Sequence, residues 1–222
     1  MPVATVDKRA TFRKMHESGC FIIPNPHDAG SARALQHLGF KALASTSAGL
    51  AWTIGKADNR VTVDDVCDHL AAICAAVDIP VNADFEDGFA HEPDKVGVNV
   101  ARAVKTGVAG LSIEDFTGDS AKPLFDRALA VDRIRAARQA IDADNSGVLL
   151  TGRCEAFLRG QKDMKLVIDR LTAYAEAGAD CLYAPGIATA EEISAVVKAV
   201  HPRPVNLLVG AAGPSLKAAS DL

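Results

Sequence analysis

The sequence has no long hydrophobic run. Its 222 residues contain no apolar stretch of 18 or more, and the polar segment 1–19 lacks the apolar core of a signal peptide. This segment is typical of an amphipathic helix instead. We therefore expect no membrane partner and a cytoplasmic location.

Basic patches are missing as well. The formal net charge is −4, charged residues make up 23% of the chain, and both signs are scattered along it. Aromatic and basic residues do not interleave as they do in nucleic-acid-binding proteins. Nucleic acid is therefore excluded as an expected partner, and the composition is that of an ordinary globular protein.

The chain also lacks a C-x-x-C pair. An odd number of irregularly spaced cysteines predicts reduced thiols rather than a disulfide framework. Cys67 and Cys74 lie seven residues apart on one face of a predicted helix, so we expect both in the core. The five cysteines are Cys20, Cys67, Cys74, Cys154 and Cys181.

Short apolar runs that favour strands alternate with helical patterns along the whole chain. Strands buried on both faces have this continuous apolar character, and the alternation predicts a parallel sheet with helical crossovers. The expected strands are 21–24, 41–46, 79–84, 109–115, 147–153, 180–186 and 204–210, and the expected helices are 28–39, 62–78, 92–107, 126–143, 161–178 and 189–200.

Two architectures fit this alternation, a (β/α)8 barrel of the TIM type and an open doubly wound sheet. No G-x-G-x-x-G follows the first strand, so the dinucleotide-binding version of the open sheet lacks its fingerprint. Polar residues instead follow the C-terminal ends of several strands, as at the mouth of a barrel. The barrel is favoured.

The eighth strand of that barrel is apparently absent from the chain. After the run at 204–210, the segment AAGPSLKAASDL has room for a short helix but not for a strand. We expect a single barrel domain over residues 1–222 that is short at its C-terminus. The open edges would be closed by further residues, by a neighbour or by a local rearrangement.

Carboxylates gather at the predicted strand ends. Asp84 and Glu86 follow the third strand, Glu114 ends the fourth, and Asp58 lies in a loop after the second. Converging carboxylates would repel and raise one another's pKa values. A Mg2+ ion, with Mn2+ as an alternative, would relieve the repulsion, with Asp84 as a direct ligand and the other three bonding its waters.

Each of these features has a structural alternative. Asp87 before Gly88 suits turn chemistry, and Asp115 and Glu155 suit salt bridges on the barrel rim. Arg153 is a planar cation suited either to a substrate carboxylate or phosphonate, or to a salt bridge with a glutamate. The small residues of 45–50 suit either an oxyanion-binding turn or a tight connection.

The chain resembles the isocitrate lyase / phosphoenolpyruvate mutase superfamily over nearly its whole length. The motifs that carry the resemblance are IPNPHDAGSA, STSAGLAWTIGKAD, VNADFEDGFA, GLSIED, TGRCEAF and AGADCLYAPG. The resemblance implies a (β/α)8 barrel, Mg2+, small 2-oxo or 2-hydroxy carboxylic acid substrates, and an enolate intermediate. It also implies a homo-oligomer, dimer or tetramer.

The resemblance assigns roles to individual positions. Metal roles fall to Asp84, Glu86, Asp58 and Glu114, and catalytic roles to Arg153, Glu114 and Asp58. Substrate binding falls to Ser45, Ser47, Gly49, Leu50 and Arg153.

The loop after the fourth strand departs from the lyases of this superfamily. Isocitrate and methylisocitrate lyases have a K-[KR]-C-G-H loop there, whereas this chain reads FTGDSAKPLFD, without Cys or His. Its polar candidates are Asp119, Ser120 and Lys122. Cys154 stands where a Ser or Thr is more usual, and it is expected either to support the site residues from behind or to serve in packing. Those lyases are therefore disfavoured.

Decarboxylation suits such a site because loss of CO2 from a 3-carboxy-2-oxo acid leaves an enolate without a base to start it. We expect C–C cleavage of this kind on an oxaloacetate-like substrate. The alternatives are a phosphonomutase or phosphonopyruvate hydrolase, and an inactive binding homologue.

Overall fold

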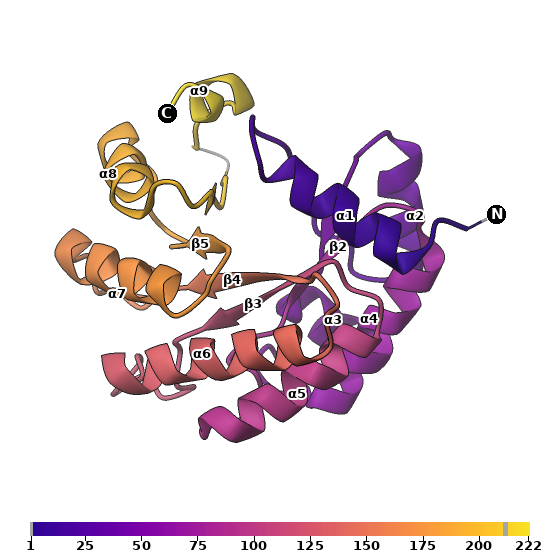
Figure 1. Cartoon of the computed structure of the whole chain (residues 1–222), viewed down its shortest axis with the longest axis horizontal. Coiled ribbons are helices and arrows are strands. Elements are labelled where there is room, and N and C mark those ends of the chain that lie inside the picture. The colour runs from indigo at the N-terminus through magenta and orange to yellow at the C-terminus, as the bar shows by residue number, and fades with distance from the viewer. Residues whose placement is uncertain (1, 211–212) are drawn as a thin grey trace.

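The computed structural model describes residues 2–210 and 213–222 (Figure 1). Within these ranges, helices and strands alternate from α4 onward, whereas α1 and α2 precede β1 and both α3 and α4 follow it. In chain order they are α1 (Thr5–Met15), α2 (Ala29–His37), β1 (Leu43–Ala44), α3 (Ser47–Thr53), α4 (Val63–Ala76), β2 (Val81–Asp84), α5 (Pro93–Lys105), β3 (Gly110–Glu114), α6 (Arg127–Ala143), β4 (Leu149–Arg153), α7 (Met164–Glu176), β5 (Cys181–Tyr183), α8 (Ala190–Val200), β6 (Val205–Asn206) and α9 (Leu216–Ser220).

The strands form one parallel sheet. The six strands in the described residues pair in the order β1-β2-β3-β4-β5-β6, each with its neighbour in the chain. Figure 1 shows this sheet curling as a half-barrel, with α5, α6 and α7 on its outer side. The architecture is that of a TIM-type (β/α)8 fold, which confirms the predicted class, and the described part of the chain contains no eighth strand.

The strand expected at 21–24 is not formed. The segment lies beside β1, where the Ala44 amide donates to the Pro24 carbonyl at 3.1 Å and Asn25 donates a side-chain hydrogen bond to the Ala44 carbonyl at 2.9 Å. A ladder cannot continue because Pro24 and Pro26 have no amide hydrogen to donate. The prediction of a first strand there was wrong.

The predicted helices are all present, and side-chain caps fix where several begin. The hydroxyl of Thr62 accepts from the Asp65 amide and the Asp65 carboxylate accepts from the Thr62 amide, so a capping box starts α4. Thr189 and Glu192 start α8 in the same way. Pro93 occupies the first turn of α5, where its missing amide hydrogen costs nothing.

The strands separate an apolar layer from a polar one. On β2, Val81 and Ala83 pack into the main hydrophobic core while Asn82 and Asp84 line a cavity inside the curve of the sheet. The strands β3, β4 and β5 repeat this alternation with Leu111, Leu150 and Leu182 in the core. The core therefore lies between the sheet and the outer helices, and the inner face is left to polar side chains.

Two smaller expectations concern helices and cysteines. Cys74 is buried and Cys67 is partly buried, both packed in the core and both free, as predicted. None of the helices in the described ranges combines the length and the apolar character needed to cross a membrane.

Candidate active site

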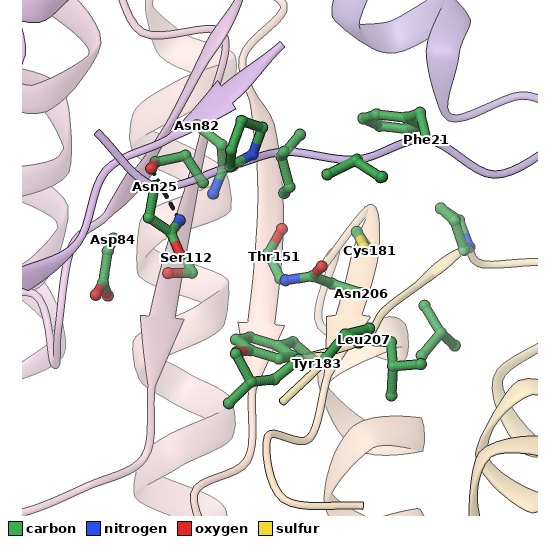
Figure 2. Close-up of a pocket in the computed structure, with 18 of the residues that line it drawn as sticks. Phe21, Asn25, Asn82, Asp84, Ser112, Thr151, Cys181, Tyr183, Asn206 and Leu207 are labelled. Carbon is green, nitrogen blue, oxygen red and sulfur yellow. Dashed lines mark hydrogen bonds between the residues drawn. The ribbon is translucent and has the colours of Figure 1, made fainter. Parts of the chain in front are cut away.

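A cavity of about 730 Å3 lies inside the curve of the sheet. Its walls come from the inward side chains of β2 to β6, from the segment 21–25 and from the start of α3. Figure 2 shows Asn82, Ser112, Thr151 and Asn206 grouped deep in it, with Asp84 and Tyr183 nearer the C-terminal ends of the strands. The cavity thus joins a polar floor to the strand ends where the carboxylates were expected.

Strand register sets which of these side chains are neighbours. Glu114 pairs in register with Arg153, and Arg153 pairs with Tyr183 on the next strand. Residues two apart on a strand share a face. Asp84 therefore points into the cavity with Asn82 on β2, and Arg153 points into it with Thr151 on β4. Acidic and basic side chains from three neighbouring strands therefore meet at the strand ends.

Arg153 lies among three carboxylates. Its Nε is 2.7 Å from Glu155 Oε1 and 3.2 Å from Glu114 Oε2, and its Nη1 is 3.3 Å from Asp84 Oδ1. Its guanidinium carbon lies 5.1 Å from the ring centre of Tyr183, which adds a cation–π contact. Both readings left open for Arg153 fit this position, since a residue in ion pairs with glutamates also faces the cavity.

Electrostatics at Arg153 favour its charged form strongly. Burial alone would lower the pKa of the Arg153 guanidinium, but Glu114, Asp84 and Glu155 outweigh it and raise that pKa further above its usual range. Burial raises the pKa of Glu114 well above its ordinary value, opposed by Arg153. The site therefore places three carboxyl groups around the single positive charge of Arg153.

Asp84 is held from both sides. Its backbone amide donates to Ser45 Oγ at 2.9 Å, and its Oδ2 accepts from the Ser47 amide at 3.1 Å. Ser47 is the first residue of α3, so its amide is one of the donors that a helix start leaves unsatisfied. Asp84, Ser45 and Ser47 all line the cavity, as the sequence predicts for site residues.

Glu86 is strained and unpaired. Its backbone has φ of +46°, a left-handed conformation that costs a side-chain-bearing residue about 1–3 kcal/mol. Its Oε1 is buried without a hydrogen-bond partner in the structure. Burial first, and then repulsion from Asp84 and Asp58, raise the pKa of Glu86 to about 8. The charge of Arg153 acts in the opposite direction but does not offset them.

Asp58 is exposed at the edge of the cavity. It belongs to the loop after α3, and its Oδ1 accepts from the following amide, that of Asn59, at 3.0 Å. It lines the cavity with Asp84, whereas Glu86 and Glu114 do not. The charges of the four predicted metal residues thus influence one another, but only Asp58 and Asp84 line the cavity.

These carboxylates fit a cation held mainly through water. Among residues 2–210 and 213–222, no group of three or more His, Cys, Asp or Glu side chains is arranged to hold a metal directly. Asp84 and Glu114 are both in ion pairs with Arg153. The unpaired Glu86 oxygen and its raised pKa fit Mg2+, which keeps several waters and needs few direct carboxylates.

Gly49 and Leu50 do not offer free amides to the cavity, contrary to expectation. Both lie within α3, a short helix that the sequence patterns did not predict, and their amides donate to Thr46. A Cβ on Gly49 would come within 2.8 Å of the His27 ring, so close packing explains the glycine. Neither residue lines the cavity.

Asp87 shows the turn chemistry expected of it. Its Oδ1 accepts from the Phe89 amide at 2.8 Å. Arg133, fully buried on α6, donates to the carbonyls of Asp87, Ala90 and His91 and so fixes the loop that carries Glu86. The sequence reasoning missed Arg133, although an arginine on the apolar stripe of a predicted helix was a usable signal.

Asp115 forms a salt bridge with Arg170 and Glu155 forms one with Arg159, as one of the two interpretations proposed. Both carboxylates are buried rather than on the barrel rim. Asp115 accepts from the Glu155 amide at 2.8 Å, from Tyr174 at 2.6 Å and from Arg170 at 3.0 Å. Burial raises the pKa of the neighbouring Cys154 thiol, which is fully enclosed, so its predicted packing role holds.

The loop 116–125 folds back on itself. Phe116 and Leu124 form an antiparallel bridge, and Thr117 Oγ1 donates to the Lys122 carbonyl at 2.6 Å. Its polar candidates Asp119, Ser120 and Lys122 are exposed and do not line the cavity.

Comparison with known proteins places the chain in a family. The family model described as phosphoenolpyruvate phosphomutase matches residues 12–222. The chain belongs to this family. Members of its superfamily are lyases and mutases, so the expected resemblance and an enzymatic class are both confirmed at that level.

Curated relatives fall on several branches. An uncharacterized protein of Mycobacterium tuberculosis H37Rv is 34% identical over 89% of this chain and 73% of its own. The 2-methylisocitrate lyase of Escherichia coli K12 is 31% identical over 72% and 55%, and the oxaloacetate decarboxylase of Rhodopseudomonas palustris is 29% identical over 82% and 64%. The chain spans little more than half of the lyase.

Solved structures share the fold closely. A protein of Burkholderia cenocepacia J2315 assigned as a lyase/mutase is 45% identical, with a TM-score of 0.94 over 98% of this chain and 79% of its own. A 2,3-dimethylmalate lyase of the same superfamily is 29% identical, with a TM-score of 0.87 over 100% and 78%. A phosphonopyruvate hydrolase complex with oxalate and Mg2+ is 26% identical, with a TM-score of 0.81 over 90% and 71%.

Proposed function

We propose that this protein is a Mg2+-dependent lyase that cleaves a C–C bond in a small 2-oxo or 2-hydroxy carboxylic acid through an enolate. An oxaloacetate-like substrate that loses CO2 suits it best. The observation that carries the proposal is the juxtaposition of Arg153 and Asp84, 3.3 Å apart on the wall of one cavity. An anion-binding cation then lies beside a carboxylate of the kind that holds a hard metal.

The residues divide into a metal group and a substrate group. Asp84 would hold Mg2+ directly, and Glu86, Asp58 and Glu114 would hold its waters. When bound, Mg2+ supplies Lewis-acid stabilisation of enolate charge. Arg153 would bind the substrate carboxylate, because its planar guanidinium presents donors in a fork to an anion.

The start of α3 would complete the substrate-binding wall. Ser45 and Ser47 face the cavity, and the positive end of the helix dipole favours an anion there. Gly49 and Leu50 would act indirectly, by permitting the close packing that sets the position of this helix start.

Decarboxylation is consistent with a loop 116–125 that has no Cys or His to act as a base. The loop has neither Cys nor His, and its exposed polar residues do not line the cavity. Loss of CO2 generates the enolate directly, so the chain needs groups that bind and orient the substrate rather than a base that starts the reaction. A site made of Arg153, a helix start and buried carboxylates meets that need.

P–C chemistry on a phosphonopyruvate-like substrate is the second candidate. The fold likeness to a phosphonopyruvate hydrolase favours it, and Arg153 suits a phosphonate as well as a carboxylate. A protein that binds such anions without turnover is the remaining alternative.

Calorimetric titration with Mg2+ and oxalate, an enolate mimic, tests the proposal. We expect Mg2+-dependent oxalate binding by the wild type and a loss of at least about 100-fold in Asp84→Asn, because charge at the metal position is removed. Asp87→Asn is the matched control, since its amide oxygen can still accept from the Phe89 amide. Analytical ultracentrifugation of the same samples measures their mass and so tests the proposed homo-oligomer, dimer or tetramer.

Unchanged binding in Asp84→Asn would contradict the metal assignment. Absence of binding in the wild type would leave no support for a Mg2+-dependent enzyme.

A further inference from the structure

Arg159 lies between the loop 116–125 and the carboxylates around Arg153. It follows β4 in a connecting segment, and 30% of its side chain is exposed. On one side, its Nη2 is 2.9 Å from Glu155 Oε2. On the other, its guanidinium carbon stacks 3.4 Å from the ring centre of Phe116. Arg159 therefore contacts the segments that follow the neighbouring strands β3 and β4.

Glu155 is shared between two arginines. Its Oε1 accepts from Arg153 Nε at 2.7 Å, while Oε2 pairs with Arg159. The carboxylate has no exposed surface, and its backbone amide is fixed by Asp115 Oδ1 at 2.8 Å. An exposed i,i+4 pair contributes little, but this pair neutralises a fully buried carboxylate. Glu155 thus links Arg153 to Arg159 through its two carboxylate oxygens.

Phe116 is the residue of the loop that Arg159 stacks on. It is buried, follows directly on Asp115, and bridges to Leu124 across the loop. The amide of Thr117 donates to the Pro123 carbonyl and that of Phe125 to the Asp115 carbonyl, both at 2.9 Å. The loop is therefore compact, and a shift of it moves the ring on which Arg159 stacks.

We propose that Arg159 is a positioning residue that couples the loop 116–125 to the substrate-binding arginine. The chain of contacts runs from Phe116 to Arg159, then to Glu155 and to Arg153. The functional half of this inference rests on the proposed role of Arg153 in binding a substrate carboxylate. When the loop is seated, Glu155 is fully neutralised and Arg153 is held facing the cavity. When the loop is displaced, that support weakens.

The test compares Arg159→Met with Arg159→Lys and with Arg135→Met as the control. Arg135 pairs with Asp132 on the exposed face of α6, so its loss changes the net charge equally at a remote place. The first readout is the Kd of oxalate with Mg2+, and the second is hydrogen exchange of the Thr117 and Phe125 amides without ligand.

We expect folded Arg159→Met to bind oxalate about tenfold more weakly and to exchange the two loop amides faster. Arg159→Lys should restore binding to within about threefold, because an ammonium still pairs with Glu155. Arg135→Met should match the wild type in both readouts. If Arg159→Met fails to fold, Phe116→Leu replaces it, with faster loop exchange and weaker oxalate binding expected.

Wild-type oxalate affinity in folded Arg159→Met would overturn the coupling to Arg153, and wild-type exchange would overturn the contact with the loop. Failure of the proposed function gives a different result. The wild type itself would then bind no oxalate with Mg2+, while the exchange comparison would still decide the contact between Arg159 and the loop.

Discussion

Arg153 carries the positive charge at the centre of the candidate site, and its neighbours make it structural as well as functional. Replacement by Met would leave the buried Glu114 and the neighbouring Asp84 without this counter-charge, and Glu155 with Arg159 alone. Removal of one partner from a buried ion pair costs several kcal/mol. We expect Arg153→Met to lower the free energy of unfolding by about 3 kcal/mol, measured by urea denaturation at pH 7.

Arg127→Met is the control for that measurement. Arg127 pairs with Asp169 where both side chains are about half exposed, and such pairs contribute less than about 1 kcal/mol. Equal stability of Arg153→Met and the wild type would show that the carboxylates find other partners.

His16 gives the stability a dependence on pH. Its ring packs at 4.5 Å from Phe12 and 5.0 Å from Phe21, and burial lowers its pKa below the ordinary 6.5 despite the Phe12 carbonyl, which acts in the opposite direction. The unfolded chain therefore takes up the proton first. The contribution of His16 is complete above pH 6.5 and is lost as the pH falls from 6.5 toward the lower pKa of the folded state.

We expect the wild type to lose stability relative to His16→Gln between pH 7.5 and pH 5, with a slope of at most about 1.4 kcal/mol per pH unit. Urea midpoints of both proteins across this range provide the measurement. Parallel pH profiles for the two proteins would refute a lowered pKa at His16.

At the scale of elements, two basic side chains anchor α1 beneath the sheet. Lys8 is buried and donates to the carbonyls of Cys74 and Val77 at the end of α4. Arg9 donates to the Val104 carbonyl at the end of α5 and to the Val108 carbonyl between α5 and β3. The last carbonyls of a helix lack partners within it, and the dipole favours cations there. These contacts tie α1 to two other helices.

Lys8→Met should therefore lower the free energy of unfolding by about 2 kcal/mol, because charged hydrogen bonds to buried carbonyls are lost. Lys14→Met, on the exposed side of the same helix, is the matched control and should change little. The measurement is thermal and urea denaturation of the two variants. A loss of the same size in both would indicate an effect of overall charge rather than of the α1 contacts.

The helices were the most predictable elements, because their signals are local. Thr62 with Asp65 caps α4 as its sequence indicates. The strand at 21–24 was mispredicted, because apolar residues dominate the pattern while Pro24 denies the backbone a donor. The helix α3 was missed, because Ser47, Ala48 and Gly49 have weak or mixed preferences and tertiary packing against His27 decides the conformation.

At the scale of the whole molecule, the alternation of strands and helices predicted the parallel sheet and its barrel curvature. The positions of Asp84 and Arg153 at strand ends predicted that they meet. The sequence could not predict that Arg153 pairs with Glu155 and Glu114 at once, because that follows from strand register and burial. Likewise, nothing local shows that Arg159 reaches Phe116.

The half-barrel differs from a closed barrel at its open side, between the segment beside β1 and β6. The cavity extends between the segment 21–25 and β6, whose residues Val205 and Asn206 are partly exposed. Leu208 and Val209 beyond β6 are about half exposed. Asp84 and Arg153 line this cavity from β2 and β4, so the proposed chemistry depends on these strands rather than on the open side.

Turnover is the most direct test of enolate-forming cleavage that depends on Mg2+. The purified protein is incubated with oxaloacetate, with Mg2+ or with EDTA, and pyruvate is followed by NMR beside a phosphonopyruvate sample followed through its phosphorus signal. We expect pyruvate formation above the spontaneous rate with Mg2+, a loss of that excess with EDTA, and a phosphorus signal that stays unchanged. Oxaloacetate decay equal to the enzyme-free rate with Mg2+ present would contradict it.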